Sequence, residues 1–285
     1  MILLTGANGV VGRPLGERLS AQNKAFKRVS RQAGEGLFKW DLTLALSDTQ
    51  AESLKGTNTL IHCAPIWLLS QHIDKLYSLG IKRMVVFSST SVISKQTSAD
   101  ESEQRLVSLL SKGESSLLNF ASSSDLKVTI LRPSMIYGYG RDQNVSHIAG
   151  FIKKYRFMVL MGKASGLRQP VHCDDLVKAC LSVLDQPKCF SRSYNLAGAE
   201  SLTYRSMVER IFKGLGRTPF IIRIPLSLFR AALNVAALLG KFSYTPEMAN
   251  RMNQDLAYDY QDACDDFAYQ PQKFLQNPQQ DLPQE

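Results

Sequence analysis

Short apolar segments alternate with helix-patterned segments through the first half of this 285-residue chain. Apolar runs bounded by turn residues predict buried strands, and apolar positions recurring every three to four residues predict helices. The predicted strands cover 2–5, 25–30, 37–40, 58–63, 82–88 and 126–131, and the predicted helices cover 10–22, 44–55, 67–79 and 101–123. This alternation is typical of an α/β fold with a doubly wound parallel sheet.

The pattern changes after Pro133. Further helices are predicted at 144–156, 174–185, 203–215, 226–240 and 245–254, with short strands near 168–172, 193–196 and 219–223. We therefore predict that residues 1–143 and parts of 168–198 form the sheet domain. Residues 144–275 mainly form a smaller, mostly helical substrate lobe. The Gln/Pro-rich end, 276–285, is predicted to be frayed.

A glycine-rich turn follows the first predicted strand, with Gly6, Gly9 and Gly12 in a GxxGxxG spacing. The first glycine allows a tight turn, the second lets the backbone approach a pyrophosphate, and the third lets the helix pack on the strand. The start of that helix presents free N–H groups to phosphates. Strand, glycine triplet and helix in this order predict a Rossmann dinucleotide site, the alternative being a glycine turn without a ligand.

In an open parallel sheet the ligand lies at the carboxyl ends of the strands. After the second strand, Ser30 and Arg31 stand where an NAD-preferring protein usually places a carboxylate for the ribose hydroxyls. The Arg31 guanidinium can fork onto a 2′-phosphate instead, with Arg13 assisting. We therefore predict NADP as the cofactor and leave NAD open. The alternative is a pair of solvated surface arginines.

Other strand ends supply the rest of the predicted site. Asp41 and Leu42 are placed to border the adenine, and the small residues after the fourth strand can lie against the dinucleotide. Hydroxyls between Phe87 and Ser91 can hydrogen-bond a substrate oxygen, or they can simply form a turn that caps the next helix. The predicted cofactor-binding residues are Gly6, Asn8, Gly9, Val10, Val11, Gly12, Arg13, Ser30, Arg31, Asp41, Leu42, Cys63, Ala64, Pro65, Ser88, Pro133 and Met135.

Taken together, these motifs resemble the extended and atypical branch of the short-chain dehydrogenase/reductase superfamily, the NAD(P)-dependent nucleotide-sugar epimerases and dehydratases. The resemblance runs from Met1 to about Phe274. It depends on Thr5-Gly-Ala-Asn-Gly-Val-Val-Gly12, Asp41-Leu42, Phe87-Ser-Ser-Thr90, Leu131-Arg-Pro133, Tyr137-Gly138 and Arg168-Gln-Pro-Val-His-Cys-Asp-Asp-Leu176.

The resemblance implies roles for several residues of this chain. It implies a catalytic hydroxyl at Thr90, a contact from Asn144 to a sugar nucleotide, and contacts from Arg168 and Arg251 to its diphosphate. For each arginine the alternative is a surface salt bridge. His172 and Asp175 are interpreted as structural residues that order the turn before the helix at 174–185.

Two departures from the family pattern change the functional prediction. The family's Tyr-x-x-x-Lys pair, counted back from Glu114, falls on Leu106 and Leu110, and the standard acid/base pair is therefore missing. Tyr137, Lys95, Thr90 and Ser91 are the candidate replacements, with Tyr137 and Thr90 predicted as catalytic and Ser91 and Lys95 as substrate-binding. In addition, the segment 64–82 is shorter than in the family. This argues against the usual four-helix dimer and leaves the oligomeric state open.

Two functions remain in competition. The first is an NADP-dependent oxidoreductase, epimerase or dehydratase acting on a nucleotide-linked or lipid-linked sugar. The second is a catalytically inactive NAD(P)-binding sensor or assembly subunit, because a fold alone does not confer activity. The first is favoured since the substrate-side residues Asn144 and Arg168 are retained.

Composition narrows the partners. The chain has a formal net charge of +9, but its cations surround no nucleic-acid-binding motif, and the charge fits a phosphorylated ligand or an anionic membrane surface. Five cysteines without a CxxC pair predict reduced thiols and no metal site. The longest apolar stretch, 225–242, is interrupted by Arg230 and Lys241, so no transmembrane segment is predicted. We also find no signal peptide and predict a cytoplasmic protein.

Overall fold

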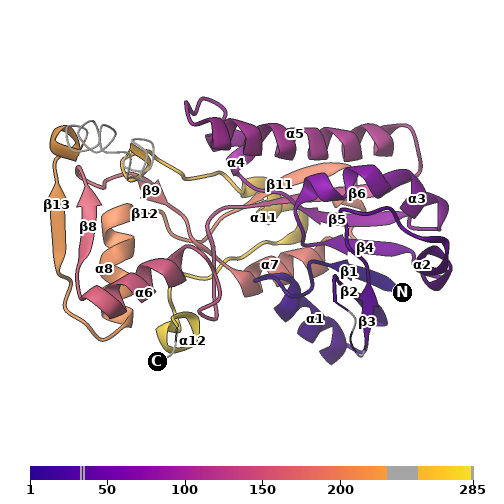
Figure 1. The fold of residues 1–285 in the computed structure, drawn as a ribbon, viewed down its shortest axis with the longest axis horizontal. Helices are drawn as coiled ribbons and strands as arrows, with labels where there is room; N and C mark the ends of the chain where they lie inside the picture. Colours follow the sequence, from indigo (N-terminus) through magenta and orange to yellow (C-terminus); the bar gives the residue numbers. More distant parts are fainter. Residues whose placement is uncertain (33, 35, 230–249, 284–285) are drawn as a thin grey trace.

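A seven-stranded parallel sheet forms the amino-terminal part of the computed structural model, which describes all residues except 33, 35, 230–249 and 284–285 (Figure 1). Its strands are β1 (Ile2–Thr5), β2 (Phe26–Ser30), β3 (Leu37–Lys39), β4 (Thr59–His62), β5 (Arg83–Phe87), β6 (Lys127–Pro133) and β11 (Arg192–Leu196). Their order is β11-β6-β5-β4-β1-β2-β3. The predicted doubly wound Rossmann sheet is confirmed, including the six strands of the first half.

The strand order reverses at the centre of the sheet. β1 pairs with β2, where Ile2 lies opposite Phe26, and with β4, where Ile2 lies opposite Thr59. The strands β2 and β3 therefore extend the sheet on one side of β1, and β4, β5 and β6 extend it on the other side. Leu3 and Leu4 are fully buried in two different hydrophobic cores, one on each face of the sheet. A strand buried on both faces explains the uninterrupted apolar run at the start of the sequence. The crevice at this reversal is where open α/β sheets bind ligands.

Helices cover both faces of the sheet (Figure 1). α1 packs with α7 over one face, and α5 packs with η1 over the other. The elements of this part are α1 (Gly12–Ala21), α2 (Asp48–Ser53), η1 (Ile66–Leu68), η2 (Ser70–His72), α3 (Ile73–Ser78), α4 (Ser91–Ser94), α5 (Glu101–Ser122), α7 (Cys173–Ser182) and η3 (Pro187–Cys189). The predicted helix 67–79 is thus divided into two 3-10 turns and one short helix.

A smaller lobe lies at the other end of the molecule (Figure 1). Its own hydrophobic core joins α6 to α8 and includes Ile152, Met207 and Phe212. Its elements are α6 (Val145–Tyr155), β8 (Met158–Met161), β9 (Leu167–Arg168), β12 (Leu202–Thr203), α8 (Tyr204–Gly214) and β13 (Ile221–Ile224). β7 (Ile136–Tyr137) and β10 (Val171–His172) pair between the two parts. The helices predicted at 226–240 and 245–254 fall largely on 230–249, outside the described residues.

The carboxyl-terminal segment is folded against both parts. It contains α11 (Gln261–Phe267) and α12 (Pro278–Asp281). The predicted frayed tail at 276–285 is therefore wrong for residues 276–283, because Asp281 and Leu282 are buried and Leu282 belongs to the core of the small lobe. Isolated apolar anchors order this segment despite its Gln/Pro-rich composition. Among the described residues, no helix combines the length and apolarity needed to cross a membrane.

Candidate cofactor and substrate site

The glycine turn after β1 is packed too closely to accept side chains. Gly6 has a φ of +67°, and a Cβ on it would lie 2.5 Å from the carbonyl carbon of Cys63 at the end of β4. A Cβ on Gly12 would lie 2.1 Å from the carbonyl oxygen of Gly6. The first and third glycines of the motif are therefore required for the turn itself.

A cavity of about 810 Å³ opens beside this turn. It is lined by residues 6–9, 29–32, 40–43, 63–65 and 68, which follow the carboxyl ends of β1, β2, β3 and β4. The structure brings ten of the predicted cofactor residues together here: Gly6, Asn8, Gly9, Ser30, Arg31, Asp41, Leu42, Cys63, Ala64 and Pro65. The volume is in the range of small-molecule sites, and the glycine cradle fits the close backbone approach of a pyrophosphate.

His62 fixes the wall of the cavity formed by the end of β4. Its Nε2 lies 3.1 Å from the carbonyl oxygen of Pro65 and its Nδ1 lies 2.8 Å from the hydroxyl of Thr5. A carbonyl can only accept, so Nε2 carries the proton and Nδ1 accepts from Thr5. Burial lowers the pKa of His62 to about 4, which keeps the ring neutral. The sequence interpretation of His62 as a packing residue agrees with this environment.

The opposite wall is held by hydrogen bonds around Asp41 and Leu42. The Asp41 carboxylate accepts the backbone N–H of Thr43 at 3.0 Å and its hydroxyl at 2.8 Å. These bonds, together with the nearby Arg31 charge, hold the pKa of Asp41 below its usual value. His72 Nε2 donates to the Leu42 carbonyl at 2.8 Å, which ties this wall to the helical layer below it.

The other predicted cofactor residues do not line this cavity. They are Val10, Val11, Gly12, Arg13, Ser88, Pro133 and Met135. Val11 is buried in the core beneath α1, and Arg13 is exposed and pairs with Glu17 at 3.4 Å. Gly12 acts through packing, as the glycine motif predicts. Of the two arginines predicted to bind a 2′-phosphate, Arg31 therefore lines the cavity and Arg13 does not.

Ser88 belongs to a buried ionic group instead. Its hydroxyl donates to Glu114 of α5 at 2.5 Å, and Arg132 of β6 donates to the same carboxylate at 2.9 and 3.1 Å. The group joins β5, β6 and α5 beneath the hydroxyl cluster. Sequence reasoning missed Arg132 as a partner, although a charged residue inside an apolar strand was the available signal.

Thr90 immediately precedes α4 and follows the carboxyl end of β5. It is 4% exposed, and its hydroxyl donates to the carbonyl of Pro133 at 3.2 Å. Ser91 is more open, and its backbone N–H donates to the Ser89 hydroxyl at 3.1 Å. The predicted hydroxyl cluster therefore lies at the end of β5. Two of its hydroxyls, those of Thr90 and Ser89, already hydrogen-bond backbone groups.

Two predicted substrate residues converge on one buried carboxylate. Lys95 Nζ and Arg251 Nη1 each lie 2.9 Å from Oε1 of Glu103, and Ser98 donates to Oε2 at 2.7 Å. Burial alone raises the pKa of Glu103, but hydrogen bonds from Lys95 and Ser98 and the Arg251 charge bring it below its ordinary value. This ionised group connects the start of α5 to the small lobe.

Arg168 is not exposed to a ligand in this structure, contrary to the prediction that it faces a diphosphate. Its Nη1 donates to the carbonyls of Leu167 at 2.7 Å and Gln254 at 2.8 Å, and its Nη2 donates to the carbonyl of Arg251. The guanidinium also lies over the Tyr204 ring, and burial lowers its pKa. Arg168 therefore fixes the backbone that carries Arg251.

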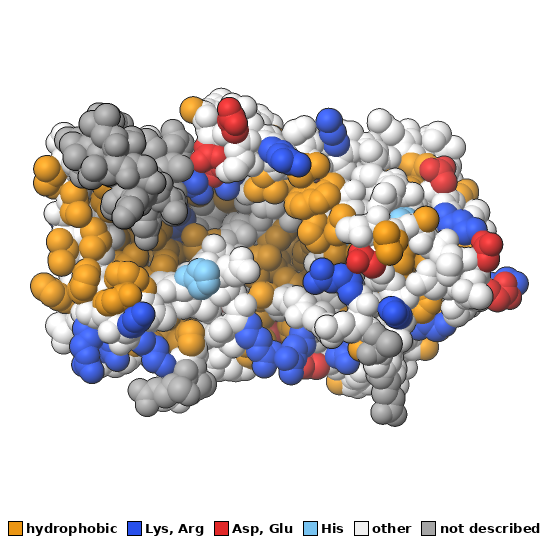
Figure 2. Space-filling view, in the orientation of Figure 1, with side chains coloured by type: hydrophobic (Ala, Val, Ile, Leu, Met, Phe, Trp, Pro, Cys, Tyr) orange, Lys and Arg blue, Asp and Glu red, His pale blue; other side chains and the backbone are white. Residues whose placement is uncertain are grey.

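Asn144 stands apart from this ionic group. It precedes the first residue of α6, is exposed, and donates from Nδ2 to the carbonyl of Ile136 at 3.4 Å. Figure 2 shows the molecule hollowed between the sheet and the small lobe on the face in view. A substrate that reaches both parts of the molecule would enter such a hollow.

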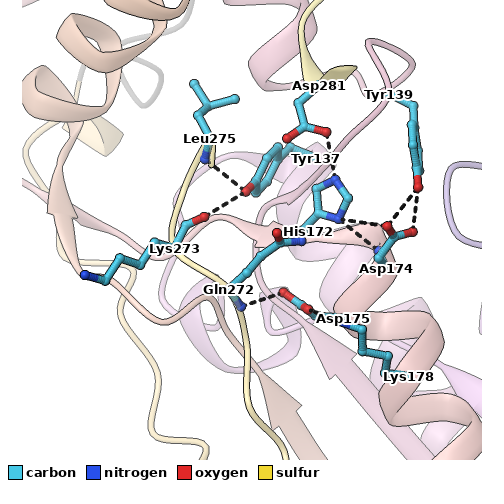
Figure 3. Close-up of polar contacts among 10 residues, drawn as sticks. All are labelled: Tyr137, Tyr139, His172, Asp174, Asp175, Lys178, Gln272, Lys273, Leu275 and Asp281. Carbon is cyan, nitrogen blue, oxygen red and sulfur yellow. Dashed lines mark hydrogen bonds and ion pairs between the residues drawn. The ribbon is translucent and has the colours of Figure 1, made fainter. Parts of the chain in front are cut away.

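Tyr137 is not a suitable proton donor, contrary to its predicted catalytic role (Figure 3). It is fully buried; its hydroxyl accepts the Leu275 N–H at 3.1 Å and donates to the Lys273 carbonyl at 3.4 Å. Burial raises its pKa well above the ordinary value. The partners come from the carboxyl-terminal segment, which no local motif around Tyr137 reveals.

The same segment holds the turn before α7 (Figure 3). His172 Nδ1 accepts the Asp174 N–H at 3.1 Å, so its Nε2 carries the proton donated to Asp281 at 2.8 Å. Asp175 accepts the N–H of Gln272 at 2.8 Å. These contacts agree with the structural roles predicted for His172 and Asp175.

The chain is similar in sequence to epimerases and dehydratases. The profile of the NAD dependent epimerase/dehydratase family matches residues 32–197. The chain is 22% identical to a UDP-glucose 4-epimerase of Vibrio cholerae, over 96% of this chain and 92% of that protein. It is 26% identical to the uncharacterized protein y4nG of Sinorhizobium fredii over 70% of this chain, but spans only 52% of that protein.

A solved structure has the same architecture. MoeE5 in complex with UDP-glucose and NAD superimposes with a TM-score of 0.71 at 18% identity, over 98% of this chain and 95% of that chain. At this identity the likeness is one of fold.

Proposed function

The chain belongs to the NAD-dependent epimerase/dehydratase family, and from that premise we propose that it is an NADP-dependent oxidoreductase of this type acting on a nucleotide-linked or lipid-linked sugar. The observation that carries the proposal is the cavity at the reversal of the strand order, where the glycine turn meets Ser30, Arg31 and Asp41. When bound, the nicotinamide supplies hydride transfer to and from a sugar carbon. We assign cofactor binding to 1–143 with the nearby parts of 168–198, and substrate binding mainly to 144–275.

The preference for NADP is argued from the end of β2. The residues that line the cavity there are Ser30, Arg31 and Gln32, none of which is a carboxylate. The Arg31 side chain is exposed at the rim and has the fork geometry that suits a phosphate. A 2′-phosphate would also offset the positive charge that Arg31 adds to the rim.

Thermal unfolding with NADPH and NADH tests this preference. NADPH should raise the melting temperature more than NADH at equal concentration. Arg31→Ala should weaken NADPH binding by about tenfold or more, because hydrogen bonds to charged groups contribute about 1.5–3 kcal/mol. Arg18→Ala is the matched control, since Arg18 is an exposed arginine of α1 that lies outside the cavity. Equal shifts by the two cofactors in the unmodified protein would refute the NADP preference.

The substrate side is assigned to the groups around Glu103. Arg251 keeps a third of its side chain exposed and is presented by a backbone that Arg168 holds. We propose that Arg251 contacts the diphosphate, with Asn144 contributing from the start of α6. Arg168 acts as a positioning residue.

Acid/base chemistry must come from residues other than a Tyr/Lys pair. With Tyr137 buried, the remaining predicted groups are Thr90, Ser91 and Lys95, and Lys95 is held as an ion pair by Glu103. We propose that the Thr90 and Ser91 hydroxyls hydrogen-bond the reacting oxygen of the sugar and pass its proton to bound water. Thr90→Val and Ser91→Ala should each lower turnover, because each removes a hydroxyl. Thr90→Ser, which keeps the hydroxyl, should have a turnover close to that of the unmodified protein.

Ligand-induced stabilisation tests the substrate class. UDP-sugars should raise the melting temperature of the NADPH-loaded protein, and the shift should be lost in Arg251→Ala. Arg205→Ala is a matched control, because Arg205 is a half-buried arginine of α8 that pairs with Glu209 and has no contact with Glu103 or Arg251 among the ion pairs described above. If UDP-sugars and free UDP both leave the melting temperature unchanged, the nucleotide-sugar substrate is excluded, and polyprenyl-phosphate sugars are tested in the same assay.

A further inference from the structure

An exposed apolar surface covers the outer end of the small lobe (Figure 2). Among the described residues, it holds four of the six exposed large hydrophobic side chains. Phe220 and Leu228 are each 61% exposed, Tyr155 is 48% exposed and Ile222 is 40% exposed. We call this surface, which runs along β13 and the end of α6, the outer patch. Exposed apolar residues that gather in one place usually mark a binding surface.

The outer patch is built on regular backbone. β13 pairs with β8 in parallel register, and Ile221 packs on the core of the small lobe. Side chains alternate along a strand, so Phe220 and Ile222 point to the opposite, outer side. At the end of α6 the Phe151 and Tyr155 rings lie 4.6 Å apart between centroids, and Phe157 lies 5.8 Å from Phe151. The aromatic side chains are thus held by their neighbours.

The segments that carry the outer patch are strongly basic. Residues 145–163 and 213–229 contain no Asp or Glu. They contain seven cations, Lys153, Lys154, Arg156, Lys163, Lys213, Arg217 and Arg223. Of the formal net charge of +9, these segments therefore carry +7 and leave +2 for the rest of the chain. The positive charge of this protein is concentrated where its apolar side chains are exposed.

Cations and aromatic rings are interleaved at the patch. Lys154 Nζ lies 5.1 Å from the centroid of the Tyr155 ring, and Arg156 follows directly as an exposed residue. Aromatic side chains that enter the interfacial region and cations that meet anionic headgroups are the two components of peripheral membrane binding.

We propose that the outer patch docks this protein on the surface of an anionic lipid bilayer. A second copy of the chain is a poor occupant, because a symmetric interface would bring the exposed Lys154 and Arg156 of both copies together with no acidic residue in these segments to pair with them. A bilayer rich in acidic phospholipid would accept the apolar side chains in its interfacial region and would pair the cations with its anionic headgroups. This proposal does not depend on the proposed reaction.

Vesicle co-sedimentation of the full chain tests the docking. The protein should bind vesicles of phosphatidylglycerol and phosphatidylcholine in equal parts and remain unbound with phosphatidylcholine alone. Added salt should weaken the binding. The double variant Lys154→Ala/Arg156→Ala should bind about 25-fold more weakly, since each cation near an anionic surface contributes about fivefold. Tyr155→Ser/Phe220→Ser should also lose binding.

The matched control is Leu44→Ser/Ile93→Ser, which removes the other two exposed large hydrophobic side chains. It should bind vesicles like the unmodified protein, and circular dichroism should confirm that every variant is folded. The proposal is overturned if the protein ignores acidic vesicles, binds neutral ones equally well, or loses binding in the control. If the protein dimerises without lipid and Tyr155→Ser/Phe220→Ser abolishes the dimer, the outer patch is assigned to a second copy of the chain instead.

Discussion

Lowering the pH from about 7 to about 5 should remove about 2 kcal/mol of folding free energy through the single side chain of His62. Its pKa is 6.5 in an ordinary environment and about 4 in the folded protein, where burial disfavours the charged ring. Between these two values the unfolded chain binds a proton that the folded chain excludes. Above pH 6.5 the ring is neutral in both states, so its titration leaves the folding free energy unchanged, and below pH 6.5 a penalty against folding grows until the pH reaches about 4.

Urea unfolding followed by circular dichroism at both pH values measures this effect. In the His62→Gln variant the side-chain amide keeps a neutral donor for Pro65, so the variant should lack the His62 part of the pH dependence. His147→Gln, which changes an exposed histidine, should keep the full dependence. Other groups that titrate are common to all three proteins. If His62→Gln loses as much stability between the two pH values as the unmodified protein, the argument is refuted.

Three other substitutions probe separate features. Glu103→Gln should destabilise the fold by about 2 kcal/mol in urea unfolding, because two cations lose their buried anion, whereas Glu101→Gln on the exposed side of the same helix should have little effect. Gly12→Ala should abolish NADPH binding and lower the melting temperature, because the added Cβ would clash with the carbonyl oxygen of Gly6. Gly150→Ala is the control: this glycine of α6 has open space around it, and the substitution should raise the free energy of unfolding by up to about 1 kcal/mol. Asp281→Asn should lower stability by about 1–3 kcal/mol, because the buried ring of its histidine partner loses a charged acceptor; an unchanged unfolding curve would contradict this.

The glycine turn and the cavity beside it could be predicted because their determinants are local in sequence. The apolar run at 2–4 specifies a strand buried on both faces, and the glycines specify a turn that only a backbone without Cβ atoms can make. Ser30 and Asp41 follow directly from the positions of the strand ends. Each inference needs only neighbouring residues and the geometry of a parallel sheet.

The substrate half could not be predicted in the same way. Whether Arg168 and Tyr137 are exposed depends on the backbone of 251–254 and 273–275, which lies more than 80 residues further along the chain. A motif gives the residue type at a position but not the later segment that covers it. The predicted frayed tail was wrong for residues 276–283 for a related reason, since the two buried side chains of Asp281 and Leu282 are enough to order a polar segment.

The return of the carboxyl-terminal segment also determines when this protein can finish folding during synthesis. Ala263 and Tyr269 belong to the core that covers β11, and Tyr194 of that strand contacts Phe267 with ring centroids 5.1 Å apart. The part of this face that lies over β11 therefore stays uncovered after all seven strands have been synthesised, although α1 and α7 already cover the rest. This apolar surface is therefore exposed to aggregation during synthesis until residues 260–269 can pack on β11.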